Sequence, residues 1–211
     1  MTVCLQLDHV NYSYGAAKIR VLSDVNADFE FGKMYAITGP SGAGKSTLLS
    51  LLAGLDAPSD GVVRFEGEDI VTTGYSRHRR EHVSLVFQDH NLIDYLTPEE
   101  NLRLVNPKAD MKILEDLGLS REESKRNIMH LSGGQRQRVA VGRALVAPGR
   151  AILADEPTGN LDPEMTDEVI NLLRHAAHQL GKCVIVVTHS KRVAGSADAV
   201  YTLRRKKLAK A

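Results

Sequence analysis

Residues 34–47, MYAITGPSGAGKST, join an apolar run to a glycine-rich turn and the start of a helix. The turn matches the pattern G-x-x-x-x-G-K-[ST], whose fixed positions are Gly39, Gly44, Lys45 and Ser46. In such a turn backbone N–H groups converge on phosphate oxygens, and the helix N-terminus adds a partial positive charge. The stretch therefore predicts an α/β fold with a phosphate-binding loop.

Within this loop, Lys45 can reach the β- and γ-phosphates of a nucleotide, and the hydroxyl of Ser46 can bind Mg²⁺. The loop alone leaves several classes of protein open, among them kinases, GTPases and other nucleotide-driven motors. The residues predicted to surround the phosphates are Gly39, Pro40, Ser41, Gly42, Ala43, Gly44, Lys45, Ser46 and Thr47, and Thr47 also opens a predicted helical run over residues 47–55.

Apolar runs at residues 34–38, 151–154 and 184–188 predict strands that are buried on both faces of a parallel sheet. A different pattern near the N-terminus, with apolar and polar residues alternating over 25–31 and 63–66, predicts antiparallel strands with one wet face. Leu5 and Leu7 are placed in another strand of that second sheet.

The pattern becomes helical between residues 98 and 131, where Ile113, Leu114 and Leu117 share one face and Gly118 is a plausible helix cap. We expect a small helical lobe inserted into the sheet domain.

Composition limits the kinds of protein that the chain can be. Its 211 residues suit one large domain, and 27 basic against 26 acidic residues give a net charge of +1, which does not favour nucleic acid or anionic lipid. Cys4 and Cys183 lie in apolar stretches and are expected to be buried thiols in a reducing compartment. No stretch has the roughly 18 apolar residues of a membrane span, so the chain is expected to be cytoplasmic or to reach a membrane through a partner.

The run 151–154 ends in two adjacent carboxylates, Asp155 and Glu156. Asp155 is expected to hold Mg²⁺ through water, and Glu156 to act as a general base or to position the attacking water. The sequence therefore predicts phosphoryl-group hydrolysis at the end of this strand.

Residues 131–135, LSGGQ, make the resemblance to a known family specific, because this pentapeptide is the signature of the ABC ATPases. Ser132 and the two glycines precede a predicted helix over 136–146, so that N–H groups and a hydroxyl can face an anion. The chain also resembles the family in the order of its motifs: phosphate loop, Gln88, signature, Asp155-Glu156 and His189.

The resemblance covers essentially the whole chain and implies roles for further residues. Gln88 would sense Mg²⁺ and the transporter, and His189 would contact the γ-phosphate. Tyr14 resembles the aromatic residue that stacks on adenine, although Tyr12 is an alternative. Residues 159–162, GNLD, resemble the D-loop, in which Asp162 would reach across a dimer interface.

The fold implied is a P-loop ATPase of ABC type, with a mainly parallel sheet flanked by helices and an N-terminal antiparallel subdomain. Residues 1–211 would form one domain. Its core would be residues 1–87 and 132–211, and residues 88–131 would hold the Q-loop and a helical lobe.

In this family two cassettes enclose two ATP molecules, and the signature of one covers the γ-phosphate held by the other. The resemblance therefore implies a homodimer that binds ATP and Mg²⁺. The catalytic residues implied are Lys45, Gln88, Glu156 and His189; the metal ligands are Ser46, Gln88 and Asp155; and the nucleotide is also met by Ser132, Gly133, Gly134, Gln135 and Asp162.

Residues 54–58, 87–93 and 156–162 resemble the MacB/LolD-like group, in which a cassette dimer on the cytoplasmic face drives a membrane permease through a groove beside the Q-loop. Only 42 residues separate Gln88 from Leu131, which implies a shortened lobe. Four apolar residues are expected either to line that groove or to be buried in the lobe: Leu92, Ile93, Tyr95 and Leu96.

Two other functions of ABC ATPases compete with transport. A soluble ABC ATPase of DNA repair, chromosomes or translation is disfavoured, because the chain has no long coiled coil, zinc module or tandem cassette. A regulatory cassette, whose membrane partner controls an extracytoplasmic enzyme, would use the same chemistry and stays open.

Overall fold

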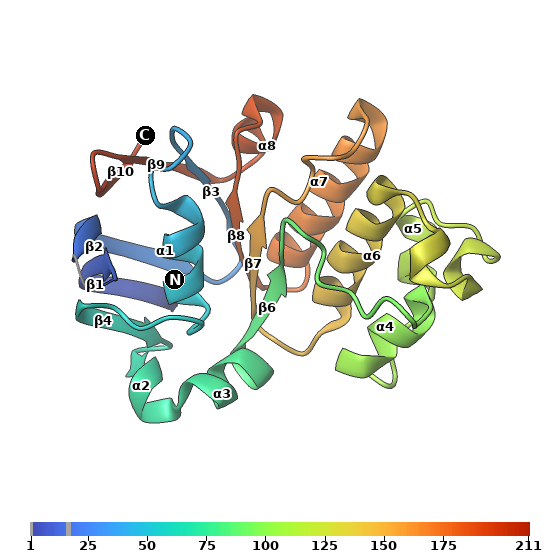
Figure 1. The fold of residues 1–211 in the computed structure, drawn as a ribbon, viewed down its shortest axis with the longest axis horizontal. Helices are drawn as coiled ribbons and strands as arrows, with labels where there is room; N and C mark the ends of the chain where they lie inside the picture. The colour runs from blue at the N-terminus through green and yellow to red at the C-terminus, as the bar shows by residue number, and fades with distance from the viewer. Residues whose placement is uncertain (1, 16–17) are drawn as a thin grey trace.

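Two β-sheets of different construction form the frame of the protein (Figure 1). The computed structural model describes residues 2–15 and 18–211, so Met1, the first residue of the predicted domain, lies outside the described residues. The smaller sheet is antiparallel and has the order β2-β1-β4-β5. Its strands confirm the alternation found in the sequence: β1 (Val3–Tyr14), β2 (Ile19–Glu30), β4 (Asp60–Phe65) and β5 (Glu68–Asp69).

The larger sheet has the order β10-β9-β3-β8-β7-β6 and is parallel except at the β10 edge. Alternate residues of one strand enter two separate cores, as when Ile185 faces one core and Val184 and Val186 face the other. This double burial explains the continuous apolar runs. The strands are β3 (Met34–Thr38), β6 (Val83–Val86), β7 (Ala151–Asp155), β8 (Cys183–Val187), β9 (Ala199–Arg204) and β10 (Lys207–Lys210).

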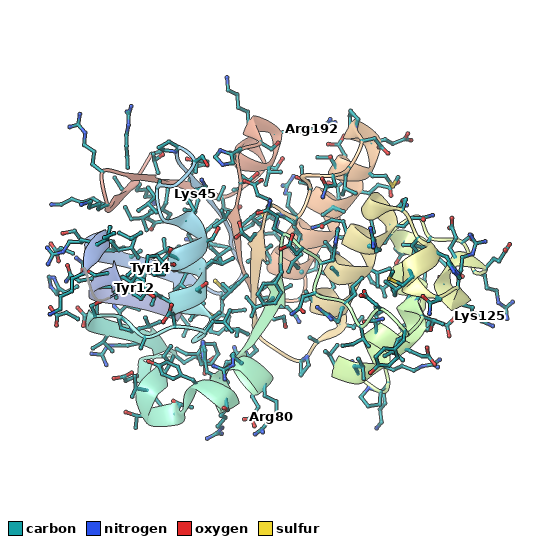
Figure 2. All side chains as sticks on the ribbon, in the orientation of Figure 1. Tyr12, Tyr14, Lys45, Arg80, Lys125 and Arg192 are labelled. Atoms are coloured by element: carbon teal, nitrogen blue, oxygen red, sulfur yellow. The ribbon has the colours of Figure 1, made fainter. Side chains whose placement is uncertain are left out.

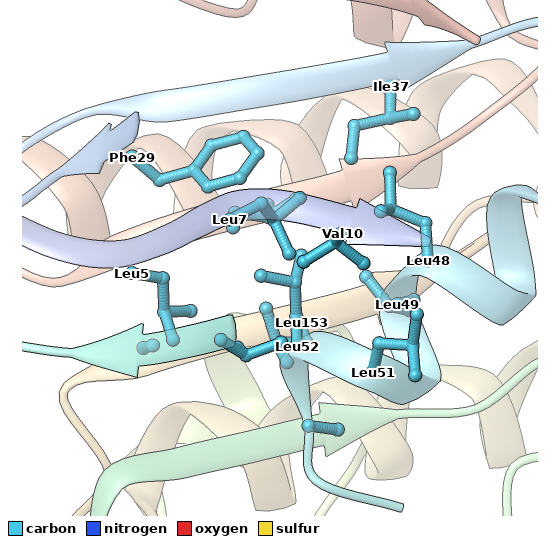
Figure 3. Packing of buried hydrophobic residues seen from close by; sticks show 14 of the residues in the cluster. Leu5, Leu7, Val10, Phe29, Ile37, Leu48, Leu49, Leu51, Leu52 and Leu153 are labelled. Carbon is cyan, nitrogen blue, oxygen red and sulfur yellow. The ribbon is translucent and has the colours of Figure 1, made fainter. Parts of the chain in front are cut away.

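Helix α1 (Lys45–Leu52) lies between the two sheets and begins at Lys45 (Figures 1 and 2). Leucines of α1 pack against β1 and the central strands of the larger sheet (Figure 3). The helix predicted to reach residue 55 ends at Leu52, because Gly54 takes a left-handed conformation with φ of 64°. The helix that follows the phosphate loop therefore has 8 residues.

The opposite face of the larger sheet is covered by α6 (Gly133–Val146) and α7 (Pro163–His178) (Figure 1). The helical lobe packs on α6, and its buried residues Leu102, Leu114 and Leu117 belong to the same core. As predicted, Gly118 ends a helix, with φ of 69° and its N–H donating to the carbonyl of Glu115. The lobe consists of α4 (Pro98–Val105), α5 (Lys112–Asp116), η2 (Glu123–Lys125) and η3 (Ile128–His130).

Four short helices complete the connections: α2 (Ile70–Thr73), α3 (Tyr75–Arg77), η1 (His78–His82) and α8 (Lys191–Gly195). Cys4 and Cys183 are both buried and both unpaired, as expected. Burial, together with the neighbouring Cys183 thiol, raises the pKa of Cys4. Over residues 2–15 and 18–211, no helix has the length and apolar character needed to cross a bilayer.

Candidate functional site

The carboxyl ends of four adjacent parallel strands meet at one edge of the larger sheet. The phosphate loop follows β3, Gln88 lies just beyond β6, Asp155 ends β7 and His189 lies just beyond β8. Ligands of open α/β sheets bind at such an edge. A cavity of about 620 Å³ lies there, and its walls include Lys45, Gln88, Asp155, Glu156 and His189.

Lys45 is buried beneath this cavity, and three groups take its ammonium donors. Its Nζ donates to the carbonyls of Gly39 and Pro40, at 3.1 Å each, and lies 3.1 Å from Nε2 of His189. None of these partners is a carboxylate, so the positive charge of Lys45 is held by dipoles alone. A phosphate oxygen can replace them with a stronger, charge-assisted hydrogen bond.

Two glycines of the loop are required by close packing as well as by their backbone conformation. At Gly39, with φ of 150°, a Cβ atom would lie 2.3 Å from the carbonyl oxygen of Leu203. At Gly44, with φ of 100°, it would lie 2.6 Å from a methyl group of Val21. The loop is therefore clamped between β9 and β2, which holds its backbone N–H groups in place for an anion.

Glu156 has a strained backbone and an unsatisfied carboxylate. Its φ is 47°, a left-handed value that glutamate rarely adopts, and such strain gathers at functional sites. Thr188 donates to Oε2 at 3.3 Å. The other oxygen, Oε1, is buried and accepts no hydrogen bond within the described chain, and it lies 3.7 Å from Nε2 of His189. This oxygen is therefore the atom of the carboxylate whose hydrogen-bonding capacity is unused in the described chain.

Three oxygen donors of the kind that Mg²⁺ prefers share one region. Ser46, Gln88 and Asp155 line both the main cavity and a neighbouring cavity of about 510 Å³. In the described residues no group of three or more His, Cys, Asp and Glu side chains is placed to hold a metal. This donor set suits a magnesium ion that is held largely by substrate phosphates and water.

The two candidate adenine-stacking tyrosines have different surroundings. Tyr12 is buried and donates to Asp56 at 2.5 Å; this hydrogen bond, with burial, raises the pKa of Tyr12 to about 12. Tyr14 is 48% exposed, lines the main cavity and shares a hydrogen bond of 2.9 Å with Thr47. Their ring centroids lie 4.9 Å apart in an edge-to-face arrangement. Only Tyr14 presents its ring to the cavity.

The signature residues stand apart from the cavity, and none of them lines it. The hydroxyl of Ser132 accepts from the N–H of Gln135 at 3.2 Å, and the Gln135 side chain accepts from the N–H of Ser132 at 2.8 Å. Gln135 also donates to Glu123 of η2 at 2.5 Å. The structure thus places Ser132, Gly133, Gly134 and Gln135 at the N-terminus of α6, outside the site formed by their own chain.

Asp162 also lies outside the cavity, at the N-terminus of α7, where its carboxylate accepts from the N–H of Met165 at 2.9 Å. The preceding residues of the same loop do reach the site, because Gly159 and Asn160 line the cavity. A Cβ atom on Gly134 would lie 3.3 Å from the carbonyl of Asn160, so the signature and this loop are in close contact.

Four residues of the site were not among the predicted site residues: Val21, Gly159, Asn160 and Thr188. Thr188 is fully buried and bonds to Glu156, while Val21 and Asn160 line the cavity. Thr188 could have been predicted as a site residue from the sequence, because it is the polar residue directly between an apolar strand and His189. Val21 carried none, because its role depends on the packing of β2 against the loop.

A third cavity, of about 410 Å³, lies where β6 and the Q-loop meet α4 and α6. It is lined by Phe87, Leu104, Val105 and the arginines Arg79, Arg80 and Arg143, among others. None of the four apolar residues expected at a groove or in the lobe lines it; Leu92 packs into the lobe core, and Tyr95 is 80% exposed. The 510 Å³ cavity shares Leu85, Phe87 and Asn91 with this third cavity, and it shares Ser46, Gln88 and Asp155 with the main cavity.

Comparison with known families and proteins agrees with this geometry. A family model described as "ABC transporter" matches residues 22–159. The chain is 37% identical to an uncharacterised ABC transporter ATP-binding protein, YclH of Bacillus subtilis, over 95% of this chain and 93% of that protein. It is 38% identical to the macrolide export ATP-binding/permease protein MacB of Escherichia coli over 97% of this chain, but spans only 34% of MacB.

Solved structures with the same fold include the dimeric structure of MJ0796, a bacterial ABC transporter cassette. The TM-score is 0.90 at 32% identity, with 98% of each chain covered. A dimeric post-hydrolysis state of the same cassette, bound to ADP and Pi, gives a TM-score of 0.88, again over 98% of each chain.

Proposed function

The chain belongs to the ABC transporter family and is an ATPase domain of that family; we propose that it hydrolyses ATP as a homodimer and thereby drives a separate membrane permease. The observation that carries the proposal is the set of polar side chains gathered at one sheet edge around the 620 Å³ cavity. Residues 1–211 act as one domain, whose Q-loop and lobe lie within residues 88–131.

The phosphate tail of ATP enters the clamped loop and displaces the partners of Lys45. The ammonium group then binds β- and γ-phosphate oxygens in place of the carbonyls of Gly39 and Pro40. His189 loses its contact with Lys45 at the same time and donates to the γ-phosphate. The ring of Tyr14 stacks on adenine at the open end of the cavity.

Ser46, Asp155 and Gln88 would hold Mg²⁺, which neutralises charge on the β- and γ-phosphates when it is bound. Asp155 supplies the one carboxylate among these three residues, and Ser46 sits at the first turn of α1. Gln88, on the loop after β6, adds an amide oxygen and connects the site to the second cavity.

Hydrolysis requires a water molecule in line with the γ-phosphorus. Oε1 of Glu156 accepts a hydrogen bond from this water and takes its proton as the water oxygen bonds to phosphorus. The bond between the γ-phosphorus and the β–γ bridging oxygen breaks, and ADP and phosphate leave. Thr188 and the strained backbone hold the carboxylate in position throughout.

The signature supplies the remaining contacts from a second copy of the chain. The hydroxyl of Ser132 and the N–H groups of Gly133 and Gly134 lie at the N-terminus of a 14-residue helix, where an anion is stabilised. They face no phosphate in their own chain, since none of them lines the cavity. Two head-to-tail copies place each signature, with Gln135 and Asp162 nearby, over the nucleotide of the other. The MJ0796 cassette, which covers the same length, is described as dimeric.

The permease is a separate chain in this proposal. MacB, by its name, is both an ATP-binding protein and a permease, and this chain spans a third of it. The groove beside the Q-loop receives the permease, which holds the ATPase at the cytoplasmic face of the membrane. The MacB likeness favours export or a related mechanical task over nucleic-acid work.

The test is ATP turnover by the purified chain with Mg²⁺, beside the Lys45→Ala variant as a matched inactive control. We expect phosphate release from the wild type and a loss of about a hundredfold or more in the variant, because the lysine stabilises the transferred group. Equal turnover by the two proteins, or none by the wild type, would contradict the proposed activity.

A further inference from the structure

The Q-loop leaves β6 through a tight turn that fixes the position of Gln88. The N–H of His90 donates to the carbonyl of Phe87 at 3.1 Å, which places Gln88 inside the turn. His90 and Asn91 both have positive φ, 63° and 48°. Two successive residues other than glycine in this region are unfavourable, so another part of the molecule has to hold them there.

The guanidinium group of an arginine on α6, the helix that follows the signature, stabilises these two conformations. Arg143 lies in the last turn of α6, and its Nη1 donates to the carbonyl of Asn91 at 2.7 Å, while Nη2 lies 3.4 Å from the carbonyl of His90. The planar fork of arginine presents its N–H donors in a fixed geometry, with one nitrogen toward each of the two neighbouring carbonyls. Both strained residues are therefore bonded to the same side chain.

Arg143 is half-buried and lines the third cavity. Burial lowers the pKa of its guanidinium, and no carboxylate of the described residues contributes to that shift. The Q-loop carbonyls supply hydrogen bonds where part of the water around the charge is removed.

We infer that Arg143 is a positioning residue, which sets the Q-loop glutamine from the signature helix and so couples the two ends of the composite site. The inference rests on the proposed function. Ser132, the N-cap residue of α6, covers the nucleotide of the other copy, and Arg143, in the last turn of α6, holds the turn that carries Gln88 of its own site. A shift of α6 on closure of the dimer therefore moves Gln88.

The chain offers a matched control in Lys182. Its ammonium group is also a half-buried cation whose pKa is lowered by burial, and it donates to backbone carbonyls just after α6, those of Ala147 at 2.8 Å and Gly149 at 2.9 Å. Neither of these two hydrogen bonds of Lys182 involves the Q-loop. A purely structural role for a half-buried cation at this helix end predicts the same outcome for both residues.

The experiment compares Arg143→Met, Arg143→Lys and Lys182→Met in the full chain. Hydrogen exchange of a peptide spanning residues 87–93 is measured beside kcat and KM for ATP and the urea midpoint. We expect Arg143→Met to speed exchange of this peptide about tenfold and to lower kcat about tenfold with KM nearly unchanged. Arg143→Lys, which keeps the charge and loses the fork, should lie in between.

Lys182→Met should lower the urea midpoint and leave both the exchange of residues 87–93 and kcat at wild-type values. The inference is overturned if Arg143→Met matches Lys182→Met in exchange and kcat. If Arg143→Met does not fold, wild-type exchange and kcat in Arg143→Lys overturn it equally. Absence of turnover in the wild type would contradict the proposed function, while the exchange comparison would still decide the role of Arg143.

Discussion

At the sheet edge, polar side chains from the ends of several strands face one cavity, whereas at the start of α6 the polar groups bond to one another. Lys45, Glu156 and His189 are within 3.7 Å of a neighbour in the group, and Glu156 keeps an oxygen free in the described chain. Ser132 and Gln135, in contrast, close a reciprocal cap that needs no ligand. One region is strained and incomplete without a substrate; the other is relaxed and stable by itself.

The difference indicates two roles: the sheet edge is suited to the chemical step, and the start of α6 is suited to recognising a ligand. Strain and an unsatisfied carboxylate can be maintained only where the surrounding fold is rigid, and the edge of a parallel sheet with both faces buried provides that rigidity. A helix N-terminus needs no such support, because its N–H groups point outward in any helix. We therefore expect substitutions at the edge to affect turnover most, and those at the signature to depend on a second copy.

The largest effect is expected for Glu156→Gln. The amide cannot take a proton from water, so kcat should fall about a thousandfold while the affinity for ATP stays within a few-fold. Steady-state phosphate release and equilibrium binding of ATP measure the two quantities. Glu115→Gln, an exposed substitution on α5, is the control and should match the wild type. Unchanged turnover in Glu156→Gln would remove Glu156 from its role.

A sharper comparison uses two helix caps of the same design. Ser132 caps α6 with Gln135, and Thr97 caps α4 with Glu100, each through a complete capping box. Ser132→Ala and Thr97→Ala should each lower the free energy of unfolding by about 1 kcal/mol, measured with urea. Only Ser132→Ala should lower kcat, by about tenfold or more, because it also removes a donor to the partner's phosphate. Equal kcat in both variants would leave Ser132 with a capping role alone.

A smaller effect, on KM for ATP, is expected at Tyr14, which is proposed to stack on adenine. Tyr14→Ala should raise KM for ATP about fivefold and leave kcat nearly unchanged, since stacking contributes on the order of 1 kcal/mol. Tyr12→Phe removes only the hydroxyl that bonds to Asp56, so it should reduce stability by about 1 kcal/mol without changing KM. A larger change of KM in Tyr12→Phe than in Tyr14→Ala would reverse the assignment.

The parts of the fold that the sequence predicted are those in which local pattern and burial agree. Continuous apolar runs predicted the central parallel strands, because residues such as Val184 and Ile185 face opposite cores. The polar residues just after those runs, including Asp155 and His189, were assigned to one site through the resemblance to the ABC family, and they line one cavity because parallel strands end at the same edge.

Contacts that depend on the packing of distant elements could not be predicted. The hydrogen bonds from Arg143 to the Q-loop join residues that are 52 and 53 positions apart in the sequence. They depend on left-handed conformations at His90 and Asn91. The choice between Tyr12 and Tyr14 was open for a related reason, since both lie on β1 and only the position of α1 decides which ring faces the cavity. The end of α1 at Leu52 was missed because Leu55 continues the apolar pattern beyond Gly54.

The central claim, that each working site combines the sheet edge of one copy with the signature of another, is tested most directly by mixing two inactive variants. Glu156→Gln disables the edge, and Gly134→Glu places an acid where an anion should bind, with its Cβ 3.3 Å from the carbonyl of Asn160. In a mixed dimer the intact signature of the first variant covers the intact edge of the second, so one site of two is whole.

Each variant alone should be nearly inactive, and an equimolar mixture, in which half of the dimers are mixed, should recover about a quarter of wild-type turnover. A matching mixture of Glu156→Gln with Lys45→Ala, both of which disable the edge, should recover nothing. If the Glu156→Gln and Gly134→Glu mixture shows no more turnover than its two components measured separately, the composite site is contradicted.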